Sequence, residues 1–151
     1  MANLGELMNA RGIVKLAVKD KNSAIEKLVD VLSKRREVGS KEKLRRSVRD
    51  REKILSTGIG GGIAVPHAKI SQVKKFCAVV GISKVGIPFD SLDGKPVHIV
   101  FMIAAPESAH DEYLRILKQL AHTLKEEDYK TRILNAKDAN AVIDVFKEIE
   151  Y

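Results

Sequence analysis

Apolar residues recur along the chain with two different periods. Residues 20–32 and 109–125 carry apolar side chains three and four positions apart, a spacing that predicts amphipathic helices. Residues 76–85 and 97–105 are instead compact apolar runs of strand length, and the almost unbroken second run is typical of a central strand covered on both faces. The chain therefore alternates helical and strand segments, which favours an α/β fold.

Shorter patterns complete the predicted elements. Residues 3–10 predict a short helix and residues 13–18 a strand, while Gly39 ends the first long helix. Helix N-caps are predicted at Asp20, Asn22 or Ser23 for the first long helix, at Ser40 for the second, and at Asp138 for a helix over 139–149 that follows one over 129–135. The second long helix is predicted to bury Leu44, Val48 and Leu55, and the helix over 109–125 to bury His110, Leu114, Leu117, Ala121 and Leu124. Together these elements predict one α/β domain over residues 1–151, a mixed β-sheet flanked by helices on both faces.

Composition narrows the class of protein. Apolar residues make up 44% of the 151 residues and charged residues 31%, which indicates a globular chain rather than a disordered one. No apolar run approaches the roughly 18 residues of a membrane span, and the first residues lack a basic segment ahead of an apolar stretch. We therefore expect a cytoplasmic protein without membrane insertion. The single cysteine, Cys77, agrees with a reducing compartment and is predicted to be a small buried hydrophobe.

The stretch STGIGGGIAVPHAK, Ser56 to Lys69, concentrates the candidate chemistry. Its glycines allow a backbone with positive φ, whose amides can converge on a phosphate. Pro66 cannot donate to a β-ladder, so His67 is predicted to lie where a strand leaves the sheet, and a neutral imidazole there can attack phosphorus. By the residues alone, a flexible loop followed by a structural histidine remains an alternative. The glycine spacing fits neither G-x-x-x-x-G-K-[ST] nor G-x-G-x-x-G, so no nucleotide-binding fingerprint is present.

The run GIGGGIAVPHA resembles the active-site signature of the fructose, mannitol and nitrogen-regulatory enzyme IIA proteins of the bacterial phosphoenolpyruvate-dependent phosphotransferase system. The blocks DREKILST, IPFDSLDGKPVHIVF and PESAHDEYLRIL resemble family blocks in the same order, so the resemblance covers most of the chain. It implies a phosphotransferase of α/β fold. It further implies that His67 is phosphorylated by the carrier HPr and passes the group to a IIB component.

The resemblance also implies three partners for His67. Arg51, seven positions before Gly58, matches a family arginine that points into the active site, and a guanidinium offers phosphate a planar fork. His110 matches a second active-site histidine, and its place in the first helical turn favours a neutral ring. Thr57 is predicted to donate its hydroxyl to phosphate, with turning or capping the backbone as the alternative. The amides of Gly60, Gly61 and Gly62 complete the predicted phosphate-binding set.

The charge pattern leaves several functions open, and no metal-ligand pattern is present. Residues 34–53 hold ten basic and four acidic side chains, so this segment supplies +6 of a net charge of +7. Three interpretations stand: a solvated helix face, a positive potential that favours a phosphorylated imidazole and steers acidic partners, and nucleic-acid binding, which the lack of aromatic residues in the segment disfavours. No His-x-x-x-His or Cys-x-x-Cys pattern accompanies His110, Asp111 and Glu112, so we expect no metal and no cofactor.

The sequence thus predicts a cytoplasmic phosphocarrier that uses HPr as donor and a IIB component as acceptor, with no nucleic-acid partner. A regulatory protein of the nitrogen branch, whose phosphorylation state controls protein partners, is the alternative. Because such partners dock transiently, a small exposed apolar patch is expected around the glycine loop.

Overall fold

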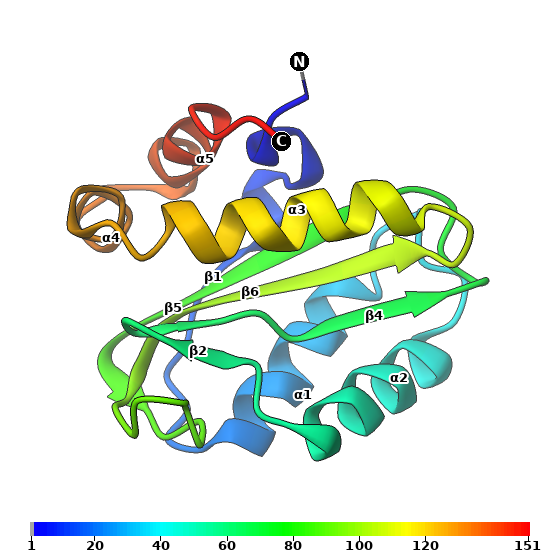
Figure 1. Ribbon diagram of the computed structural model, residues 1–151, viewed down its shortest axis with the longest axis horizontal. Coiled ribbons are helices and arrows are strands. Elements are labelled where there is room, and N and C mark those ends of the chain that lie inside the picture. Colours follow the sequence, from blue (N-terminus) through cyan, green and yellow to red (C-terminus); the bar gives the residue numbers. More distant parts are fainter. Residues whose placement is uncertain (1) are drawn as a thin grey trace.

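A mixed sheet of six strands forms the centre of the molecule (Figure 1), for which the computed structural model describes residues 2–151. The two longest strands, β5 and β6, pair antiparallel, and β6 pairs parallel with β3 and β4 on its other side. The order is β1-β5-β6-β3-β2, with β4 also on β6. The strands are β1 (Ile13–Lys15), β2 (Gly58–Gly60), β3 (Ile63–Ala64), β4 (His67–Ile70), β5 (Cys77–Ile87) and β6 (Val97–Pro106).

Helices cover both faces of this sheet, as the sequence predicts. Helices α1 (Lys21–Leu32) and α2 (Lys41–Ile54) lie on one face, and α3 (His110–Thr123), α4 (Glu127–Leu134) and α5 (Ala139–Lys147) lie on the other (Figure 1). Short 3-10 turns at Leu4–Leu7 and Ala10–Gly12 stand where one short helix is predicted over residues 3–10. Among residues 2–151, no helix combines the length and apolar character needed to cross a bilayer.

Strand β6 is buried from both sides because its alternate residues enter two separate cores. Val100, Met102 and Ala104 pack with α1 and α2, whereas Ile99, Phe101 and Ile103 pack with the helices of the opposite face. Successive side chains of a strand point to opposite faces, so a strand buried twice must be apolar at nearly every position. The almost unbroken apolar run therefore predicts correctly that β6 is a central strand covered on both faces.

The predicted N-caps hold, but two predicted apolar stripes need correction. Side-chain oxygens of Asp20, Ser40 and Asp138 accept from backbone amides three residues later. Leu55 lies beyond the end of α2 on extended backbone and is 58% exposed, so it does not continue that helix's buried stripe. In α3 the buried residues are Tyr113, Ile116, Leu120 and Thr123, whereas His110 and Leu114 are exposed. Apolar residues occupy two neighbouring rows of this helix, so the predicted stripe is only partly buried: Leu117 is half-buried and Leu124 fully buried, as predicted.

The prediction that His67 lies where a strand leaves the sheet is wrong, because His67 begins β4. Ile63 pairs with Ile99 and His67 with Ile103, so β3 and β4 follow β6 in one continuous register. The interruption between them is Val65-Pro66, where proline has no amide proton for the ladder. Pro66 still accepts a hydrogen bond from the amide of Ile103 at 3.1 Å, and this contact keeps the chain on β6.

Candidate active site

His67 lies half-buried at the start of β4, on the face of the sheet that α3 covers. Its ring meets the ring of Tyr113 edge-on, with centroids 5.5 Å apart and planes inclined by 64°. Its Nδ1 lies 2.7 Å from the carbonyl oxygen of Val65. A carbonyl can only accept, so Nδ1 carries the proton and the lone pair of the neutral ring is on Nε2. The second ring nitrogen is thereby prepared as a nucleophile.

The surroundings keep this imidazole neutral. Burial lowers the pKa of His67 below its ordinary value of 6.5, and the positive charge of Arg51 lowers it further. The hydrogen bond to Val65 and the negative charge of Glu52 act in the opposite direction, but burial is the largest effect. A neutral ring is the form that attacks an electrophile, so His67 stays reactive somewhat below pH 6.5.

This lowered pKa gives a testable dependence on pH. Near pH 6.5 the unfolded chain binds more protons at His67 than the folded chain, so the contribution of His67 to stability is complete above pH 6.5 and is lost as pH falls through its folded pKa. We expect a nuclear magnetic resonance (NMR) titration to place its midpoint below 6.5. Urea unfolding at several pH values should show a shallower decline for His67→Gln than for the wild type. A midpoint at or above 6.5 would contradict the structure.

Three side chains from β4 and α3 gather next to His67. Lys69 lies two residues along the strand and so on the same face, with its Nζ 2.7 Å from Nδ1 of His110 and 5.3 Å from the Tyr113 ring centroid. An ammonium group can only donate, so Nδ1 of His110 accepts and Nε2 holds the proton. His110 thus lies against Lys69 and near the ring of Tyr113, which His67 also contacts, although His110 is exposed. Sequence reasoning missed Lys69, which the two-residue spacing from His67 would have indicated.

Arg51 stands at the edge of the same group, in the last turn of α2. Its Nη1 donates to the carbonyl oxygen of Leu55 at 2.7 Å. Burial raises the pKa of Tyr113 to about 12, and the charge of Arg51 opposes this rise. Because the same charge also lowers the pKa of His67, Arg51 acts electrostatically on both rings, and its role in holding phosphate stays a prediction.

Thr57 lies beneath the site rather than in it. Only 3% of the residue is exposed, and its hydroxyl donates to Oε1 of Glu52 at 2.6 Å while its amide donates to Oε2 at 2.8 Å. The hydroxyl proton predicted for phosphate is thus directed at a carboxylate of the chain itself. Glu52, which is 8% exposed, is a second residue that sequence reasoning missed, because a glutamate within a charged helix gives no sign of burial.

The glycine turn lies at the opposite end of this edge of the sheet. Gly60, Gly61 and Gly62 have φ of 93°, 67° and 80°, and together they turn β2 back into β3. The Gly61 amide donates to Oδ2 of Asp93 at 3.1 Å. The carbonyl of Gly62 accepts from the amide of His98, five residues and about 16 Å along β6 from Ile103, the partner of His67. The structure therefore does not bring these three amides to His67.

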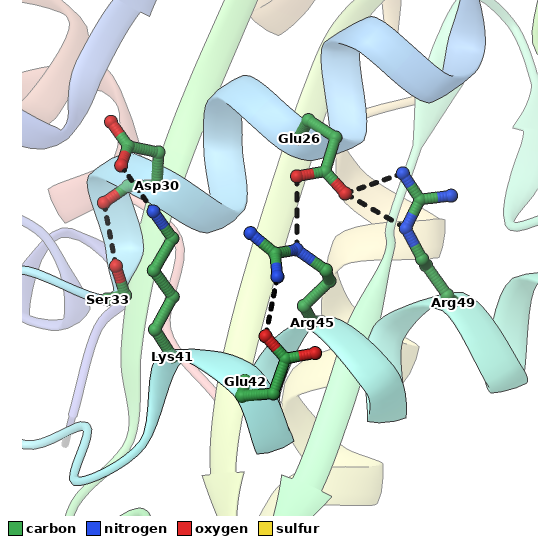
Figure 2. A network of polar contacts seen from close by, with 7 residues as sticks. All are labelled: Glu26, Asp30, Ser33, Lys41, Glu42, Arg45 and Arg49. Carbon is green, nitrogen blue, oxygen red and sulfur yellow. Dashed lines mark hydrogen bonds and ion pairs between the residues drawn. The ribbon is translucent and has the colours of Figure 1, made fainter.

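Three basic side chains of α2 pair with acidic residues of α1 (Figure 2). Glu26 accepts from Nε of Arg45 at 3.1 Å and from Nε of Arg49 at 2.9 Å, and Asp30 pairs with Lys41 at 2.8 Å. These contacts support the interpretation of a solvated helix face that joins α1 to α2. Over residues 2–151, no cluster of three or more His, Cys, Asp and Glu side chains has an arrangement that could hold a metal ion. Burial raises the pKa of Cys77 to about 12, as for an unreactive buried thiol.

Comparison with known proteins identifies the class to which this fold and site belong. Residues 7–149 match the model of the family described as "Phosphoenolpyruvate-dependent sugar phosphotransferase system, EIIA 2". The match extends over nearly the whole chain, so the chain belongs to this family of phosphotransferase-system proteins.

Individual relatives agree with this assignment. The fructose-specific EIIABC component of Bacillus subtilis is 38% identical over 86% of this chain, which spans only 20% of that longer protein. The fructose-specific EIIA component of Haloferax volcanii is 35% identical over 85% of this chain and 84% of its own length. The crystal structure of the nitrogen regulatory protein IIA-Ntr from Neisseria meningitidis superimposes with a TM-score of 0.88 at 27% identity, covering 95% of this chain and 98% of that one.

Proposed function

We propose that this chain is a phosphocarrier that holds a phosphoryl group on Nε2 of His67, receives it from phosphorylated HPr and passes it to a IIB component. The observation that carries the proposal is the hydrogen bond from Nδ1 of His67 to the Val65 carbonyl. It fixes the ring orientation and leaves the lone pair on Nε2. Burial lowers the pKa of the same ring, so the nucleophile is available at neutral pH.

The transfer itself exchanges one phosphorus–nitrogen bond for another. The Nε2 lone pair forms the new bond, the bond to the donor nitrogen breaks, and the donor keeps that electron pair. The proton stays on Nδ1, which donates to the Val65 carbonyl throughout the transfer. No proton therefore has to leave His67 during the step, and the residues around it are needed for position and charge.

Positive charge surrounds the position that the phosphoryl oxygens would take. Arg51 supplies a guanidinium fork, Lys69 supplies an ammonium group, and His110 has Nε2–H as a neutral donor. Helix α3 begins at His110, and its N-cap, Ala109, makes no side-chain hydrogen bond to the first-turn amides. Those amides remain suited to an anion. We propose that these groups, more than the glycine turn, stabilise the transferred charge.

Exposed apolar residues lie beside Arg51 and near the start of the glycine loop, and they suit a transient partner. Ile54 and Leu55, at the end of α2 next to Arg51, are 79% and 58% exposed. Leu92 is 67% exposed, and its amide donates to Gly58 near the start of the glycine loop. Small apolar surfaces within a polar rim are common at weak protein–protein contacts, which fits a carrier that must leave one partner for the next.

A regulatory role remains the second candidate, and specific observations favour it. Besides the Neisseria structure, the nitrogen regulatory protein of Pseudomonas aeruginosa matches 95% of this chain at 28% identity. In a regulatory protein the phosphoryl group on His67 would alter binding to protein partners and would not be passed to a sugar-specific component. The fructose-specific relatives, one of them an EIIABC protein, favour transfer to a IIB component.

The test is to phosphorylate the protein with phosphorylated HPr and to locate the phosphoryl group by ³¹P and ¹H–¹⁵N NMR. We expect it on Nε2 of His67, with the Nδ1 proton retained. Addition of a purified fructose-type IIB component should then discharge the protein. A phosphoryl group that persists with IIB would favour the regulatory role, whereas failure to accept the group from HPr, or its appearance at another residue, would refute the proposal.

A further inference from the structure

We infer that Glu52 is a positioning residue for phosphoryl transfer, because its buried carboxylate fixes both the segment that orients His67 and the helix turn that carries Arg51. The inference rests on the proposed role of His67. Glu52 accepts two hydrogen bonds, from the Thr57 amide at 2.8 Å and from the Thr57 hydroxyl at 2.6 Å, and forms an ion pair with Nζ of Lys21 at 2.8 Å. Its side chain is 5% exposed.

The path from this carboxylate to the reactive ring has two further hydrogen bonds. The carbonyl of Thr57 accepts from the amide of Val65 at 3.0 Å, and the carbonyl of Val65 accepts from Nδ1 of His67 at 2.7 Å. Val65 belongs to the interruption between β3 and β4, where Pro66 removes one ladder bond. The contact with Thr57 therefore replaces regular sheet pairing as the support for the carbonyl that orients the imidazole.

The same carboxylate sets the position of the predicted arginine. Glu52 and Arg51 are consecutive residues of α2: Glu52 is buried, whereas the charge of Arg51 acts on His67. Helix α2 ends two residues later at Ile54, and the chain then continues on extended backbone to Thr57. By joining the last turn of α2 to Thr57, Glu52 holds Arg51 and His67 at a fixed separation. Such a separation matters because misplacement by about 1 Å can cost on the order of 100-fold in rate.

The chemistry of the contact explains why a carboxylate is needed at this position. The amide and the hydroxyl of Thr57 donate to different oxygens of Glu52, and Lys21 shares Oε2 with the amide. A glutamine has only one oxygen, and its NH2 group would face a donor. Lys21 pairs with the buried carboxylate at 2.8 Å and lies 5.1 Å from the ring centroid of Phe89.

Glu26 provides a matched control because it also joins α1 to α2 through basic side chains. It pairs with Arg45 and Arg49 at 38% side-chain exposure (Figure 2), and neither arginine is hydrogen-bonded to Thr57. Glu26→Gln and Glu52→Gln both remove one negative charge between the same helices. Only the second change touches the path to the active site.

The experiment compares wild type, Glu52→Gln and Glu26→Gln in two measurements. For Glu52→Gln we expect the rate of phosphoryl transfer from phosphorylated HPr to fall by about tenfold or more, and for Glu26→Gln to stay within about twofold. An NMR titration should show the pKa of His67 lowered in Glu52→Gln, since a negative charge that raises it is lost, and unchanged in Glu26→Gln. A folded Glu52→Gln protein with the wild-type rate would overturn the inference.

A second pair of variants covers the case in which Glu52→Gln does not fold. Thr57→Ser keeps the hydroxyl that donates to Glu52, whereas Thr57→Val keeps the shape and loses the donor. We expect Thr57→Ser to retain clearly more of the transfer rate than Thr57→Val, and equal rates would contradict the inference. If the wild type itself accepts no phosphoryl group, the proposed function fails. The His67 titration still tests the coupling to Glu52 in that case.

Discussion

Replacement of His67 by alanine should abolish incorporation of a phosphoryl group into this chain. The expected loss is complete because the proposed nucleophile is the imidazole nitrogen itself, which alanine lacks. The measurement is incubation with phosphoenolpyruvate, enzyme I and HPr, followed by mass spectrometry of the intact protein. Phosphohistidine is labile in acid, so the samples should be kept at neutral or alkaline pH.

His122→Ala is the matched control for this experiment. His122 is exposed near the end of α3, and it is not part of the group around His67. We expect this variant to be phosphorylated as fully as the wild type. A label retained in His67→Ala would refute the assignment of the nucleophile, and a label lost in His122→Ala would show that the assay reports something other than chemistry at His67.

Replacement of Phe101 by alanine should greatly lower the free energy of unfolding of this protein. Phe101 lies at the centre of β6 with no exposed surface, and its ring packs against that of Phe146 of α5 with centroids 5.5 Å apart. Removing a fully buried phenyl ring costs its transfer free energy and leaves a cavity, about 3–5 kcal/mol together. Urea unfolding should show this decrease in the free energy of unfolding, which is a large part of a typical domain's stability.

Val85→Ala provides the comparison for Phe101→Ala. Val85 lies on the neighbouring strand β5 but is 93% exposed, so its truncation removes almost no buried surface. We expect a change within about 0.5 kcal/mol, as for most surface substitutions. A loss of less than about 1 kcal/mol for Phe101→Ala would mean that the sheet is not packed against α5 as the structure shows.

Much of the fold follows from local patterns in the sequence. The unbroken apolar run of residues 97–105 predicts a strand covered on both faces, and β6 fills both cores. The capping residues Ser40 and Asp138 mark helix starts because their side chains satisfy amides only three residues away. Which row of α3 is buried cannot be predicted from the sequence of the helix alone. Leu114 and Ile116 are both apolar, and only contact with the sheet decides that Ile116 is buried.

The candidate site likewise has residues that the sequence predicts and residues that only the structure places. The motif around His67 identifies the nucleophile, and the family blocks identify Arg51 and His110. The motif also suggests that the glycines hold phosphate, yet Gly61 is directed at Asp93 on the loop before β6, and Lys130 of α4 donates to its carbonyl at 2.9 Å. Glycine patterns report where the backbone needs positive φ, and a tight turn needs it as much as an anion site does.

The sequence by itself determined the types and order of the main elements and the family, and it predicts His67 as the reactive histidine, because these depend on side-chain periodicity and on contiguous motifs. Only the tertiary structure decided that Lys69 and His110 meet beside His67, that Thr57 turns to Glu52, and that Lys21 of α1 balances that carboxylate. These contacts join residues on different elements, and their partners are fixed by how the helices pack on the sheet. Hydrogen bonds and burial act over a few ångströms in space, whatever the separation along the chain.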